Sequence, residues 1–100
     1  MSLTNPGGSV FVNADAAIGR SGVPVRIYNA TWLSGATAGD LVLRNGTGDS
    51  DQIYVNAVGT VNQTATLNWQ SGLFFPDGCF FDKDTNLTSA VIAYEVAGPQ

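Results

Sequence analysis

Residues Val23–Leu33, with the sequence VPVRIYNATWL, decide the fold. Apolar side chains recur at every second position of this stretch, which is the pattern of a β-strand with one buried face. We expect the more apolar odd-numbered positions to face the core and the even-numbered positions to face solvent. The predicted core face holds Val23, Val25, Ile27, Asn29, Thr31 and Leu33, and the predicted outer face holds Pro24, Arg26, Tyr28, Ala30 and Trp32. The strand is long, and we expect a bend near Asn29.

Most of the remaining chain also has the pattern of short strands separated by turn residues. Proline presets its backbone angle and glycine accepts positive φ, so Pro76–Gly78 predicts a tight turn between two apolar strands. Only Asp15–Ile18 offers the start of a helix, and Gly19 ends it at once. The other predicted strands are Val10–Val12, Leu41–Arg44, Gln52–Val58, Gln63–Trp69, Leu73–Phe75, Cys79–Phe81 and Ala90–Val96.

These features predict an all-β protein with little helix, folded as a single antiparallel β-sandwich of about eight strands. Jelly-roll-like and immunoglobulin-like topologies both fit the strand spacing. A chain of 100 residues suits one domain. We assign residues 1–8 to an N-terminal arm and residues 9–100 to the sandwich domain.

The composition predicts a mostly neutral surface. Only 12% of the residues are charged, against about 25% in ordinary soluble domains, and the formal net charge is −4. Nucleic-acid binding rests on clustered Lys and Arg, of which the chain holds four, so we expect no nucleic-acid partner. No apolar run approaches the roughly 20 residues of a membrane span, so we expect no membrane partner. Weak charge repulsion favours association with other proteins.

The residue types that the chain lacks argue against catalysis. It has no histidine and one cysteine, Cys79, so Ser-His-Asp, Cys-His and zinc sites cannot be assembled within one chain. Glu95 lies in a predicted strand without the identifiable second carboxylate that glycoside hydrolysis needs. Residues 82–86 match the first half of a calcium-binding loop, but Leu87 stands where that loop requires glycine. We therefore expect no enzyme, no cofactor and no metal, and we favour a plain acidic turn.

The aromatic residues divide between core and surface. Arg26, Tyr28 and Trp32 share the face of the long strand that is predicted to be exposed. These residue types are enriched at protein interfaces, and exposed aromatic rings also stack on sugars. The alternative is that other strands or loops cover this face, so that both rings fill a second layer. Residues predicted to lie in the core are Trp69, which shares a face with Ala65 and Leu67, and most of Phe74, Phe75, Phe80 and Phe81.

Three stretches carry a resemblance to a known group of proteins. They are Ser34–Thr47 (SGATAGDLVLRNGT), Gly72–Asp82 (GLFFPDGCFFD) and Val91–Glu95 (VIAYE). They resemble small all-β virion proteins of marine tailed bacteriophages, which are similar in size and composition to capsid decoration, or cement, proteins. The resemblance spans residues 23 to 95. It implies a non-enzymatic structural protein that attaches to the outer surface of the assembled capsid and stabilises it.

The implied function sets the expected partners. The major capsid protein is the first of these, and a second copy of the chain is a further candidate. The expected location is the virion, on the capsid surface, after synthesis in the host cytoplasm. The alternative is a carbohydrate- or receptor-binding module of a phage fibre or spike, with Tyr28, Trp32 and Tyr54 as its stacking surface. The candidate interface residues are Arg26, Tyr28, Trp32, Tyr54, Asn5 and Pro6, the last two from the N-terminal arm.

Overall fold

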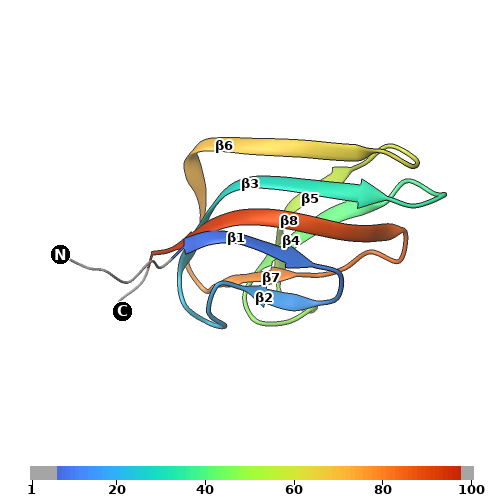
Figure 1. Cartoon of the computed structure of the whole chain (residues 1–100). Coiled ribbons are helices and arrows are strands. Elements are labelled where there is room, and N and C mark those ends of the chain that lie inside the picture. Colours follow the sequence, from blue (N-terminus) through green and yellow to red (C-terminus); the bar gives the residue numbers. More distant parts are fainter. Residues whose placement is uncertain (1–6, 98–100) are drawn as a thin grey trace.

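Two four-stranded antiparallel sheets, packed face to face, make up the protein (Figure 1). The structure is a computed structural model and describes residues 7–97, which contain strands and turns but no helix. Sheet A has the strand order β1 (Gly7–Val12), β8 (Leu87–Val96), β3 (Val25–Ser34), β6 (Thr64–Phe75). Sheet B has the order β2 (Ala16–Ile18), β7 (Cys79–Phe81), β4 (Asp40–Asn45), β5 (Gln52–Val58). The predicted all-β sandwich is confirmed.

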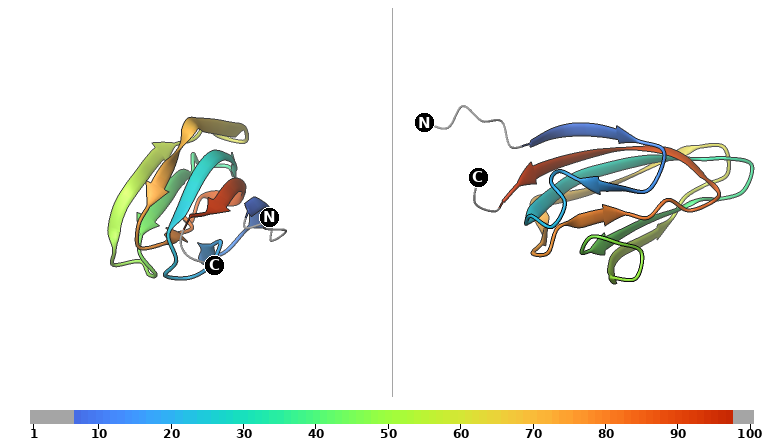
Figure 2. Two further views of the ribbon diagram at one scale, coloured as in Figure 1. Left: turned by 90° about the vertical axis from the view of Figure 1, so that its left-hand side faces the viewer. Right: turned by 90° about the horizontal axis from the view of Figure 1, so that it is seen from below.

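The strand pairing decides between the two topologies that the sequence left open. Strand β1 pairs with β8, β2 with β7, β3 with β6 and β4 with β5, as in one long hairpin wound over on itself. A hairpin wound in this way into two four-stranded sheets is a jelly roll. Figure 2 shows the two sheets from two further sides, with β1 beside β8 at one margin of the sandwich.

Several predicted boundaries differ from the observed ones. The expected helix start at Asp15–Ile18 is instead the short strand β2. The two strands predicted at Gln63–Trp69 and Leu73–Phe75 are parts of the single strand β6. At its end the predicted tight turn is present, because the Gly78 amide donates to the Phe75 carbonyl at 3.2 Å, and it leads from sheet A into sheet B. Strand β1 begins at Gly7, inside the predicted arm, while Asn5 and Pro6 lie outside the described residues.

A β-bulge interrupts the alternation of β3. On the neighbouring strand β8, Tyr94 pairs with Ile27 and the preceding residue Ala93 pairs with Asn29, so Tyr28 is an extra residue in β3. An extra residue transfers every later side chain of the strand to the opposite face. The predicted bend near Asn29 therefore coincides with a reversal of the two faces.

The bulge overturns the expected exposure of Trp32. Before it, Val25 and Ile27 face the core and are fully buried, as the alternation predicts. After it, the inward positions are Ala30 and Trp32, of which Trp32 is only 2% exposed. The strict two-residue period assigned Trp32 to the wrong face, because sequence periodicity does not reveal where a strand gains a residue.

Trp32 also fastens the loops at one end of the sandwich. Its indole Nε1 donates to the Gly39 carbonyl at 3.2 Å, and the Gly59 amide donates to the same oxygen at 3.0 Å. A Cβ atom at Gly59 would lie 2.7 Å from the indole nitrogen, so only glycine fits there. The Ser34 hydroxyl accepts a bond from the Gly39 amide at 2.9 Å. A buried tryptophan thus holds the β3–β4 loop and the end of β5 together.

The remaining aromatic residues follow the predictions in part. Phe75 and Phe81 are fully buried, and Phe80 is half-buried. Trp69 is partly buried and packs against the core. Phe74 is 40% exposed and lies on the outer face, beneath the Arg26 guanidinium. The buried hydrophobic residues are Val12, Ile18, Val25, Ile27, Ala30, Trp32, Leu41, Leu43, Val55, Phe75, Cys79, Phe81, Leu87, Ala90 and Ile92.

Replacing Trp32 tests its assignment to the core. We expect Trp32→Ala to lower the free energy of unfolding by about 3–5 kcal/mol, because it leaves a cavity and removes a buried hydrogen bond. The matched control is Phe11→Ala, which truncates a ring that is 62% exposed and should change that free energy by less than about 1 kcal/mol. Denaturant unfolding measures both variants. Equal losses for the two would contradict the burial of Trp32.

Single-residue deletions test the bulge. Removing Tyr28 keeps Val25, Ile27, Ala30 and Trp32 on the inner face, so the variant should fold with a loss of about 1–3 kcal/mol in unfolding free energy. Removing Thr31 instead turns Trp32 outward, and this variant should not fold cooperatively. Circular dichroism during thermal unfolding distinguishes them. The interpretation fails if the Thr31 deletion folds as well as the Tyr28 deletion.

Candidate protein interface

Two of the predicted interface residues do lie together on the outer face of sheet A. The Arg26 guanidinium carbon is 4.8 Å from the centroid of the Phe74 ring, and the Tyr28 hydroxyl donates to Glu95 Oε1 at 3.0 Å. That hydrogen bond to the carboxylate raises the pKa of Tyr28 above its usual value. Gly72 lies under the Tyr28 ring, where a Cβ would be 3.0 Å from a ring carbon. These side chains form one interlocked group at one end of the face.

The other predicted residues do not join this group. Trp32 is buried, so it presents no ring to a partner. Tyr54 lies on β5 in the other sheet, where it is the extra residue of a second bulge, and its ring centroid is 5.2 Å from that of Phe75. Asn5 and Pro6 lie outside the described residues. The predicted aromatic surface of Tyr28, Trp32 and Tyr54 is therefore wrong.

An unbroken row of outward side chains crosses the middle of sheet A instead. Thr31 on β3 pairs with Val91 on β8 and with Thr66 on β6, and Val91 pairs in turn with Phe11 on β1. Phe11 is 62% exposed and Val91 is 42% exposed. We call the outward residues of the four strands the sheet A outer face. The members used below are Ser9, Phe11, Asn29, Thr31, Leu33, Thr64, Thr66, Asn68, Ser89, Val91 and Ala93.

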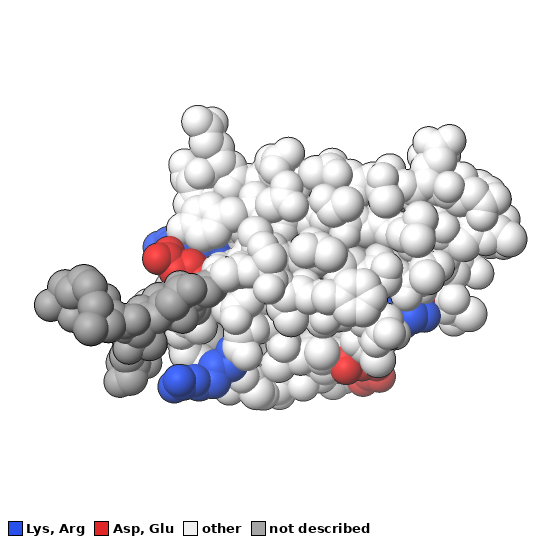
Figure 3. All heavy atoms as spheres, viewed as in Figure 1, with Lys and Arg blue, Asp and Glu red and all other residues white. Residues whose placement is uncertain are grey.

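The middle of this face is polar without being charged. The Asn29 amide donates to the Asn68 carbonyl oxygen, and the Thr31 and Thr66 hydroxyls are 3.0 Å apart, within hydrogen-bond distance. Figure 3 looks onto the face and shows the coloured, charged atoms only at its margins. Because neutral groups shed water at a smaller free-energy cost than ions, such a face is well suited to being covered by another protein.

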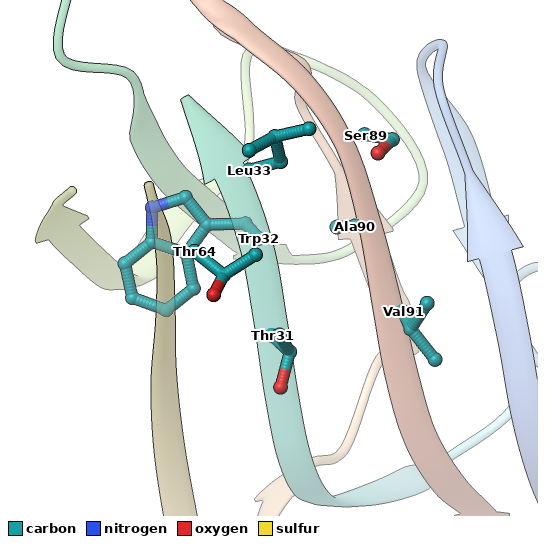
Figure 4. Close-up of a pocket in the computed structure, with 7 residues that line it drawn as sticks. All are labelled: Thr31, Trp32, Leu33, Thr64, Ser89, Ala90 and Val91. Atoms are coloured by element: carbon teal, nitrogen blue, oxygen red, sulfur yellow. The ribbon is translucent and has the colours of Figure 1, made fainter. Parts of the chain in front are cut away.

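A shallow, mostly apolar hollow of about 160 Å³ lies in this face (Figure 4). This volume is below the roughly 300–1,000 Å³ of small-molecule pockets. The hollow is better matched to a single projecting side chain than to a substrate. Its lining residues are Thr31, Leu33, Thr64, Ser89 and Val91 from the outer face, together with Trp32 and Ala90.

The acidic residues of the turn after β7 make contacts within the protein. Asp82 forms an ion pair with Arg44 at 2.9 Å. An Asp84 carboxylate oxygen accepts bonds from the backbone amides of Asp40 at 3.3 Å and Asn86 at 3.1 Å. In the part of the chain that the structure describes, no group of three His, Cys, Asp or Glu side chains is arranged to hold a metal ion. These carboxylates therefore connect the turn after β7 to strand β4.

Sequence reasoning missed Phe11 and Val91 as surface residues. Phe11 stands between Val10 and Val12, so an apolar run concealed which of the three faces outward. The alternation of β6 did contain a usable signal, because Thr64, Thr66 and Asn68 mark one polar, uncharged face. The pairing of β1 with β8, which sets Phe11 beside Val91, is a contact between distant parts of the chain that local periodicity does not specify.

Comparisons of the chain with protein-family models, with curated proteins and with solved structures find no match. Among residues 7–97, no helix has the length and apolar character needed to cross a membrane.

The single cysteine provides a test of the inner packing of sheet B. Cys79 is 1% exposed, and burial raises the pKa of its thiol. Thiol reagents attack the thiolate, so a raised pKa keeps Cys79 protonated and unreactive at neutral and mildly alkaline pH. We expect no labelling by a maleimide in the native protein and complete labelling after denaturation, as measured by mass spectrometry. Rapid labelling of the native protein would contradict the packing around β7.

Proposed function

We propose that the protein is a non-enzymatic structural component of a bacteriophage virion, which attaches to the outer surface of the assembled capsid and stabilises it. The partner in this proposal is the major capsid protein. The observation that carries the proposal is the sheet A outer face, which combines the exposed Phe11 and Val91 with neutral Thr and Asn side chains across four strands. The resemblance of residues 23 to 95 to phage virion proteins points to the same role.

The chemistry of this face suits lasting attachment to another protein. Phe11 and Val91 supply apolar area, and a partner that covers them gains about 25 cal/mol for each Å² removed from water. The hydroxyl and amide groups around them have hydrogen-bonding capacity for a partner's backbone and side chains. The hollow between Thr31 and Val91 gives one projecting side chain of the partner a fixed position.

Stabilisation of the capsid follows from linkage. A protein that binds only the assembled lattice stabilises it by RT ln(1 + [L]/Kd), which is about 2.7 kcal/mol per site at a hundredfold excess over Kd. A jelly roll is also an architecture found in viral capsid domains, although fold alone does not assign function. Attachment in this manner needs no catalytic group and no metal.

The carbohydrate-binding alternative required Tyr28, Trp32 and Tyr54 to form one exposed aromatic surface, and the structure separates them. Its three rings are divided between the core, the end of sheet A and the edge of sheet B, so no sugar can stack on them together. The hydroxyl of Tyr28 is already hydrogen-bonded to Glu95 within the protein. We therefore retain capsid attachment as the proposed function.

Charged substitutions on the outer face test the proposal. We expect Phe11→Asp and Val91→Asp each to weaken binding to purified capsids that lack this protein by at least tenfold, equivalent to about 1.4 kcal/mol. Each change buries an unpaired carboxylate beneath the partner. Co-sedimentation with capsids measures the affinity, and thermal unfolding checks that the isolated variants remain folded.

The matched control is Ser50→Asp, which adds the same charge to an exposed residue of the β4–β5 loop. It should bind capsids as the unaltered protein does. A protein that fails to bind such capsids would overturn the proposed function. Binding that is equally reduced by the control would instead overturn the assignment to the sheet A outer face.

A further inference from the structure

The two strands β5 and β6 form one open side of the sandwich. Each is the last strand of its sheet, β6 in sheet A and β5 in sheet B, and the chain connects them directly. Figure 2 shows both strands at the outside of the molecule. Residues 52–75, which include both strands and their connection, contain no Asp, Glu, Lys or Arg. We call these residues the neutral edge.

Exposed large hydrophobic side chains concentrate on the neutral edge. Outside it, the described residues with such exposure are Phe11 and Val91, which belong to the sheet A outer face. The inner side of β6 is also incompletely covered, because Leu67 and Trp69 are only partly buried. Apolar side chains exposed along an uncharged edge favour contact with other protein. The members on the neutral edge are Ile53 (42% exposed), Tyr54 (38%), Val58 (71%), Val61 (43%) and Phe74 (40%).

Strand β6 also lacks the usual protection of an edge strand. An edge strand presents unpaired backbone N–H and C=O groups, and proteins commonly shield these with charged residues, proline or a very short strand. Strand β6 is 12 residues long and contains neither a charged residue nor proline. The opposite margin of sheet B ends in β2, which has only 3 residues.

The segment Thr64–Asn68 has a side-chain pattern that is symmetric about its middle residue. Its sequence TATLN alternates polar, apolar, polar, apolar and polar, and this alternation is the same in both directions although the residues differ. In an antiparallel pair of two such segments, polar residues lie opposite polar ones on the outer face and apolar residues lie opposite apolar ones on the inner face. Because the net charge of −4 arises entirely outside the neutral edge, two copies meet there without like charges in contact.

We propose that a second copy of this chain pairs with the neutral edge, through antiparallel pairing of the two β6 strands about a two-fold axis near Thr66. The pairing joins the two A sheets into one continuous sheet and satisfies the edge hydrogen bonds of Thr64–Asn68. The axis is perpendicular to the sheet, so the outer faces of both copies point the same way. The two β5 strands approach each other beneath, which covers apolar area of the neutral edge. Such an interface is isologous.

Opposite charges introduced at Thr66 test this pairing on the isolated full chain. We expect the unaltered protein to be a dimer by analytical ultracentrifugation, and Thr66→Lys and Thr66→Glu each to be monomeric, because like charges then oppose each other near the axis. An equimolar mixture of the two variants should restore the dimer. Recovery on mixing cannot come from a folding defect. The matched control, Thr85→Lys in the β7–β8 turn, should remain a dimer.

A disulfide test gives the register. Cys79 is buried, so Thr66→Cys adds one accessible thiol, and oxidation should cross-link two copies much faster than it does for Thr85→Cys. The proposal is overturned if the unaltered protein stays monomeric up to about 1 mM, the level of a Kd worth only about 4 kcal/mol. It is also overturned if both charged Thr66 variants remain dimers. Capsid binding is measured separately, so neither result decides the proposed function.

Discussion

The extra residue at Tyr28 is the constraint on which the sandwich depends. Strand β3 is an inner strand of sheet A and pairs with β8 on one side and β6 on the other, and its pairing with both neighbours shifts between Ile27 and Asn29. The bulge lets Ile27 and Ala30 both face the core, although three positions separate them. It also places Tyr28 and Asn29 on the same outer side. Without this residue the strand would keep one period throughout.

The bulge determines which side chains of β3 lie in the core and which lie on the surface. Turning Trp32 inward supplies the group that binds the Gly39 carbonyl, and this fastens the loops where β3, β4 and β5 end. The same reversal turns Thr31 and Leu33 outward, beside Val91, and so creates the neutral middle of the sheet A outer face. The aromatic ring that would have projected from the face is replaced by small polar and aliphatic groups. The middle of the face therefore carries no tryptophan ring.

The local sequence pattern was sufficient to predict the class of fold and the bounds of several strands. The bounds of β5 and β7 match the predicted Gln52–Val58 and Cys79–Phe81, because turn residues flank both segments. The bulge at Tyr54 was not predicted. The jelly-roll order was not predictable, because it depends on which distant strands pair. The predicted faces of β3 were wrong from Asn29 onward, since a bulge depends on the partner strands β8 and β6. The stretch VPVRIYNATWL indicated a bend near Asn29 but not the extra residue that reverses the faces. Arg26 and Tyr28 were placed on the correct face only because they precede or form the bulge.

The central claim, that the bulge turns Trp32 into the core, is tested most directly by the fluorescence of a Trp69→Phe variant, in which Trp32 is the only tryptophan. Trp32 is 2% exposed, so its emission should be blue-shifted relative to the unfolded chain and resistant to quenching by acrylamide until the protein unfolds. Emission at the wavelength of the unfolded chain, with efficient quenching in the native state, would place Trp32 on the surface. That result would contradict both the bulge and the neutral outer face derived from it.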